Sequence, residues 1–150
     1  MDNRSPLVSG LTGCLLGAVI GLGGAPAWGT EAIPSPAQSS AAAEQTVMVN
    51  ILARKFDPPV VTLQAGQKTA LIFQNKDAEL HAFVAVDLLK GVNLNVSGNG
   101  APEFGPEGFK RVIIPSLGHV EIRFVPEHPG RYSYLCDMPG HEMKATIVVQ

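Results

Sequence analysis

The chain has 150 residues, of which 45% are hydrophobic and 16% charged, and it contains 16 glycines and 12 prolines. This length supports one domain, and such an apolar, weakly charged, turn-rich composition is typical of a small all-β protein rather than a helical bundle or a disordered tail. The formal net charge of −2 gives no electrostatic reason to expect a nucleic-acid partner.

Residues 1–29 are predicted to be a secretory signal peptide. Arg4 is the only basic side chain of this segment, and residues 7–27 are uncharged and largely apolar. Small residues offer cleavage points after Ala27 or after Gly29. We therefore expect the protein to be periplasmic or otherwise exported.

The same segment leaves a membrane tether open as an alternative to soluble export. Residues 11–14 match the pattern that precedes a lipidated cysteine in bacterial lipoproteins, but the apolar run continues past Cys14, where a lipoprotein normally turns polar. A retained helical anchor is the other alternative, although the many glycines make a poor permanent span. Residues 30–45, rich in Ala, Ser, Pro and Gln, are predicted to be a flexible linker.

Residues 46–150 are predicted to form an all-β sandwich of seven to eight short strands. The predicted strands are runs of alternating or β-branched residues at 46–52, 60–63, 68–73, 80–86, 110–114, 118–125, 131–136 and 145–149. Turn-forming residues separate these runs, as in Asp57-Pro58-Pro59, which cannot continue a central strand. No helical period is long enough to predict a helix.

Residues 87–118 interrupt this pattern and are predicted to be mostly a long irregular insertion. The segment is rich in asparagine, glycine and proline, and only its short strand at 110–114 is regular. A loop of this length is uncommon and is usually functional or mobile. It could cover the site, dock a partner or pack over the sandwich, and the sequence does not choose between these.

A thiol, an imidazole and a thioether lie close together near the C-terminus. Cys136 ends a predicted strand, Pro139-Gly140 forms a turn, and His141 and Met143 follow before the last strand. A lone cysteine in an exported domain is often a small buried hydrophobe, but its neighbours here favour a ligand role. Cys, His and Met are the ligands of copper, and two His, one Cys and a weak axial Met make a blue-copper site. The second His must come from elsewhere in the chain.

His81 is the best candidate for that second imidazole. It opens an apolar strand directly after a polar turn, so it can stand at one end of the sandwich. His119 lies on the solvent side of its strand, opposite Val120 and Ile122, and His128 lies in a proline-bounded turn. We expect His119 to be a surface residue and neither of the two to be a ligand.

These segments resemble the cupredoxin family. Residues 75–83 look like the turn and strand that present its first His, and residues 118–149 look like its last strands and ligand loop; the resemblance spans 46–150 and is weak through 87–117. It implies a Greek-key sandwich that holds one type 1 copper ion. It further implies His81, Cys136 and His141 as the equatorial ligands and Met143 as the axial ligand.

The spacing of Met143 departs from the family pattern. Members with a Pro-Gly-His loop commonly place about four residues between the second His and the Met, whereas only Glu142 intervenes here. Residues i and i+2 share a strand face, so Met143 can still point where His141 points. Met138 is the other thioether nearby, and its expected role is to form apolar surface around an exposed His141.

The resemblance implies a carrier of single electrons rather than an enzyme. Its expected partners are redox proteins of the cytochrome, oxidase or reductase type, which dock near His141 in weak, short-lived complexes. A copper delivery or buffering protein that uses the same ligands is the alternative. A multicopper oxidase or nitrite reductase would need a second, His-rich domain, and a dinuclear copper centre would need two cysteines on the loop; neither is expected here.

Overall fold

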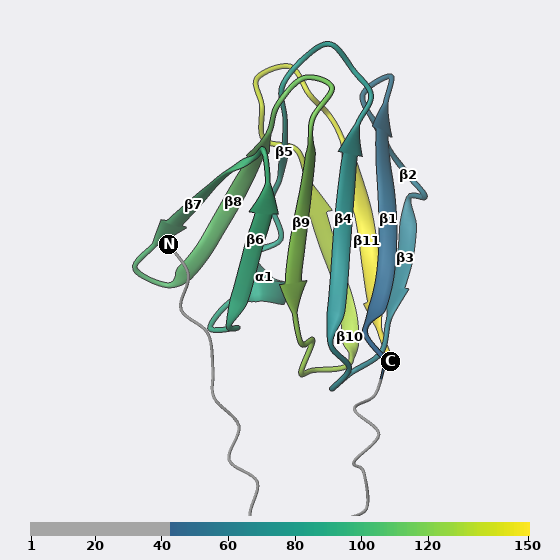
Figure 1. Cartoon of the computed structure of the whole chain (residues 1–150), viewed down its shortest axis with the longest axis vertical. Coiled ribbons are helices and arrows are strands. Elements are labelled where there is room, and N and C mark those ends of the chain that lie inside the picture. The colour runs from purple at the N-terminus through teal and green to yellow at the C-terminus, as the bar shows by residue number, and fades with distance from the viewer. Residues whose placement is uncertain (1–42) are drawn as a thin grey trace, which may run out of the picture. The chain divides into compact units, whose positions relative to one another are not determined.

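The computed structural model describes residues 43–150, and the predicted signal peptide and almost all of the predicted linker lie outside these residues. The described part contains eleven strands and one short helix (Figure 1). Among residues 43–150, no helix is long and apolar enough to cross a membrane.

A five-stranded sheet forms one layer of a β-sandwich. Its order is β2-β1-β4-β9-β6, in which β1 and β4 are parallel and the other pairs are antiparallel. Buried and more exposed residues alternate along β4 and β9, so each strand turns one face to the core. The strands are β1 Gln45–Leu52, β2 Lys55–Asp57, β4 Thr69–Asn75, β6 Leu94–Gly98 and β9 His119–Phe124.

Two three-stranded sheets form the opposite layer, in the orders β10-β11-β3 and β5-β8-β7. Val84 and Leu135 join them through a pair of backbone hydrogen bonds of 3.0 and 3.1 Å, so β5 lies beside the end of β10. This junction matters because His81 begins β5 and Cys136 follows β10. The strands are β3 Val60–Leu63, β5 His81–Phe83, β7 Ala101–Gly105, β8 Gly108–Ile114, β10 Gly130–Leu135 and β11 Lys144–Val149.

The prediction of an all-β sandwich is confirmed, but the prediction that residues 87–118 are mostly irregular is wrong. This segment contains the end of helix α1 (Val86–Leu89) and strands β6, β7 and β8, of which β7 and β8 form a hairpin that leans outward in Figure 1. The strands were missed because β6 and β7 lie at sheet edges with few buried residues, where asparagine, glycine and Pro102 are tolerated. A glycine is needed at Gly98, the last residue of β6. Its φ is +101°, and an added Cβ would lie 2.6 Å from the His119 carbonyl oxygen.

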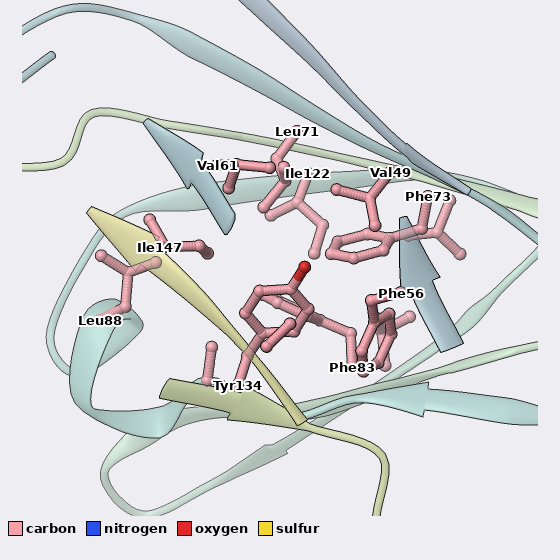
Figure 2. Packing of buried hydrophobic residues seen from close by; sticks show 14 of the residues in the cluster. Val49, Phe56, Val61, Leu71, Phe73, Phe83, Leu88, Ile122, Tyr134 and Ile147 are labelled. Atoms are coloured by element: carbon pink, nitrogen blue, oxygen red, sulfur yellow. The ribbon is translucent and has the colours of Figure 1, made fainter. Parts of the chain in front are cut away.

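An aromatic cluster fills the core between the layers. Phe73 lies 4.5 Å from Phe83 between ring centroids, and Tyr134 lies 4.8 Å from Phe56 and 5.3 Å from Phe83. Figure 2 shows the Tyr134 hydroxyl pointing into this apolar cluster, where it has no hydrogen-bond partner among the described residues. Burial raises the pKa of Tyr134, so the phenol stays protonated. Strand β10, which Cys136 follows, is thereby packed against a dense core.

Candidate metal centre

The β4–β5 and β10–β11 loops meet at the upper end of the sandwich in Figure 1. Three predicted ligands, His81, Cys136 and His141, converge there. The Cys136 sulfur lies 3.4 Å from Nδ1 of His141 and 4.0 Å from Nδ1 of His81. One donor atom from each of the three residues lies within 4.8 Å of the others. His119 and His128 are exposed and stand outside this group, as the sequence predicts.

The backbone holds the sulfur in place. The Ala82 N–H donates a hydrogen bond of 3.2 Å to Cys136 Sγ, which ties the sulfur to the strand that carries His81. In the ligand loop the His141 N–H donates to the Met138 carbonyl at 3.0 Å, and Gly140 adopts a φ of +77° that favours glycine. The donor atoms are therefore brought together by the fold itself.

Met143 lies opposite Cys136 across the ligand loop. The Cys136 N–H donates to the Met143 carbonyl at 3.1 Å, and Met143 is 3% exposed and packs with the hydrophobic core. Met138, the other nearby thioether, is partly buried against the same core. The role of Met143 as an axial ligand stays a prediction.

A carboxylate faces the second nitrogen of each imidazole, which sequence reasoning missed. His81 Nε2 lies 2.9 Å from Asp77 Oδ2, and His141 Nε2 lies 3.6 Å from Glu79 Oε2. Such outer carboxylates fix the orientation and the tautomer of a ligating His and raise its basicity. The only sequence signal for these carboxylates is the position of Asp77, four residues before His81 in a polar turn. An aspartate in such a turn is equally typical of the turn itself.

The charges of these groups suit metal binding. Burial lowers the pKa of His81, although the Asp77 carboxylate opposes this change, so the imidazole is neutral and able to bind a metal. Burial alone raises the pKa of Asp77, but N–H donors from Arg54 and Ala53 and the contact with His81 outweigh it and hold that pKa below its usual range. The Arg54 guanidinium lowers the pKa of Glu79.

Asn75 anchors the loop that carries both carboxylates. Its Nδ2 donates to the carbonyl oxygens of Glu79 and Pro115, at 2.8 and 2.9 Å, and its Oδ1 accepts the Asp77 N–H at 2.9 Å. Asn75 is 1% exposed, so these bonds form in a region sheltered from water. The outer carboxylates are thus held before any metal is bound.

The prediction that His141 is exposed is wrong for its side chain. The side chain is only 7% exposed, because its ring packs 4.8 Å from the His81 ring, between centroids, and its Nε2 faces the Glu79 carboxylate. Leu80 and Leu117 are 46% and 67% exposed and provide apolar surface at the β4–β5 loop, next to the predicted ligands.

The donor set fits copper. One thiol sulfur and two imidazole nitrogens within 4.8 Å of one another form the trigonal donor group of a blue-copper site. Each donor imidazole has a partner for its other nitrogen, as ligating His residues nearly always do. Copper is the cofactor that this chemistry supports.

The fold and the donor set together define a copper-protein domain of the β-sandwich type. A model of the cupredoxin-like domain family matches residues 25–149, which is most of the chain. The chain therefore belongs to the cupredoxin-like domain family.

Solved structures of the same fold include two auracyanins. Auracyanin A, described as a "blue" copper protein from the green thermophilic photosynthetic bacterium Chloroflexus aurantiacus, is 19% identical with a TM-score of 0.52, and the match covers 72% of this chain and all of that one. Auracyanin B is 25% identical with a TM-score of 0.51, covering 71% of this chain and 88% of the other. A search of curated protein sequences finds no match to this chain.

Proposed function

We propose that this protein is a type 1 copper protein that carries single electrons between larger redox proteins and catalyses no reaction of its own. One observation carries the proposal: a thiol and two imidazoles converge at one end of a densely packed sandwich. Membership of the cupredoxin-like family and the likeness in fold to the auracyanins support it.

In this proposal His81, Cys136 and His141 hold the metal through Nδ1, Sγ and Nδ1, and Met143 is the weak axial ligand. A bound copper ion would take up and give back one electron by alternating between Cu(II) and Cu(I). The contribution of the protein is rigidity, since the Ala82 N–H bond to the sulfur and the carboxylates behind the imidazoles oppose rearrangement of the donors. A small rearrangement keeps electron transfer fast.

The proposed partners are redox proteins that dock over the end of the sandwich that holds His141. Leu80 is exposed directly before His81, and Met138 lies in the ligand loop, so this end offers apolar surface close to the donors. A small apolar contact suits a complex that forms and separates quickly. The pattern of residues 1–29 supports an exported location, either free or tethered through the N-terminal segment.

The experiment that tests this function compares redox cycling with copper release. The copper-loaded protein is reduced and reoxidised repeatedly by small redox reagents in the presence of a Cu(I) chelator. An electron carrier should complete many cycles and keep its copper, because the same three donors satisfy both oxidation states. A protein for copper delivery or buffering, the second use of these ligands, would instead pass its copper to the chelator on the first reduction. That result would overturn the proposal.

A further inference from the structure

Two strained residues lie in the turn next to the metal centre. The β1–β2 hairpin has a two-residue loop, Ala53-Arg54, and both residues are left-handed, with φ values of +51° and +56°. Turns of this kind prefer Asn-Gly, because a side chain at positive φ is strained. A non-glycine pair keeps this shape only where contacts with the surrounding structure stabilise it.

Asp77 holds this turn in its strained shape. Its two carboxylate oxygens accept the N–H groups of Ala53 and Arg54, at 2.7 and 3.0 Å, and one of the same oxygens faces His81 Nε2. The turn and the first imidazole thus share one carboxylate. Since the donors are backbone N–H groups, these bonds fix the position of the Arg54 backbone and so the direction in which its side chain leaves the turn.

The Arg54 side chain reaches the second carboxylate. Its Nε and Nη2 donate to the two oxygens of Glu79, at 2.6 and 2.7 Å, which is a bidentate contact that fixes the carboxylate plane. The oxygen that receives Nη2 is the one 3.6 Å from His141 Nε2. Arg54 therefore decides where a negative charge stands relative to the second imidazole.

We propose that Arg54 is a positioning residue of the copper centre, which holds the Glu79 carboxylate beside His141 and thereby lowers the reduction potential. The inference rests on the proposed copper function. A carboxylate at Nε2 makes the imidazole a stronger donor and favours the more highly charged Cu(II) over Cu(I). Arginine is required because its planar fork binds both oxygens, whereas lysine offers a single point charge.

The test measures reduction potentials of the copper-loaded protein in a double-mutant cycle. Glu79→Gln is expected to weaken the binding of Cu(II) relative to that of Cu(I) about tenfold. This change raises the reduction potential by about 59 mV for a one-electron couple. Arg54→Lys keeps the positive charge but loses the fork, so it should raise the potential in the same direction. Adding Arg54→Lys to Glu79→Gln should then change nothing further, because the carboxylate that arginine positions is already gone.

Glu107→Gln is the matched control. Glu107 pairs with Lys90 at 3.1 Å in an exposed ion pair, and it precedes β8, whose far end pairs with His81, about 20 Å away along the strand. Removing this charge should leave the potential unchanged. Urea unfolding of the metal-free variants checks that each one is folded.

The outcomes separate the inference from the function on which it rests. If the unsubstituted protein shows no thiolate-to-copper absorption band, the proposed function fails and the inference fails with it. Two results would overturn the positioning role alone while that band is present. Either Arg54→Lys leaves the reduction potential unchanged, or it shifts the potential equally in the unsubstituted protein and in the Glu79→Gln variant.

Discussion

Replacing Cys136 with serine is expected to abolish the intense visible absorption of the copper-loaded protein. That absorption arises from charge transfer between a thiolate and copper, and Cys136 is the only cysteine among the described residues. Serine keeps an acceptor for the Ala82 N–H, which now donates to the sulfur at 3.2 Å, so the fold should persist. Visible absorption and electron paramagnetic resonance spectra of the Cu(II) form give the readout.

His128→Ala is the control for this substitution. His128 is exposed and lies in the turn before β10, outside the group of donor atoms, so its removal should leave the band unchanged. A band that survives in Cys136→Ser would show that the colour comes from another ligand and would contradict the assigned centre.

Phe73→Ala is expected to destabilise the protein by about 3–5 kcal/mol, the usual cost of removing a buried phenylalanine. Phe73 is fully buried between the layers and packs against Phe83 at 4.5 Å and Tyr134 at 6.0 Å, so its loss leaves a cavity in the middle of the aromatic cluster. The free energy of unfolding is measured by urea titration of the metal-free protein.

Phe104→Ala is the matched aromatic control for that measurement. Phe104 lies on the edge strand β7 and is 59% exposed. Its ring makes one edge contact with Phe109, at 6.0 Å between centroids, so its truncation should change the free energy of unfolding by about 1 kcal/mol. Equal effects at the two positions would mean that the aromatic cluster is not the centre of the core.

The strands that could be predicted from the sequence are those with one strongly buried face. β9 and β11 alternate buried and more exposed residues along nearly their whole length, so the period of two is visible in the residue types. β6 and β7 have almost no buried residues, and β6 pairs with β9, a strand far along the chain. Local pattern could not reveal them.

The residues of the candidate site likewise fall into those that the sequence could predict and those that it could not. Cys136 and His141 stand five residues apart in one loop, so their proximity follows from the chain itself, and His81 could be chosen because it opens an apolar strand. The contact of Arg54 with Glu79 joins residues 25 apart, and the bonds from its turn to Asp77 join residues about as distant. These contacts exist only after the hairpin and the β4–β5 loop have met, and residue spacing could not predict them.

X-ray absorption at the copper edge of the loaded protein tests the central claim most directly, since it reports the atoms bound to the metal. We expect one copper per chain, with a short bond to a single sulfur and two bonds to imidazole nitrogens, as the positions of Cys136, His81 and His141 require. A copper environment of nitrogen and oxygen alone, with no short sulfur bond, would contradict the assignment of this centre.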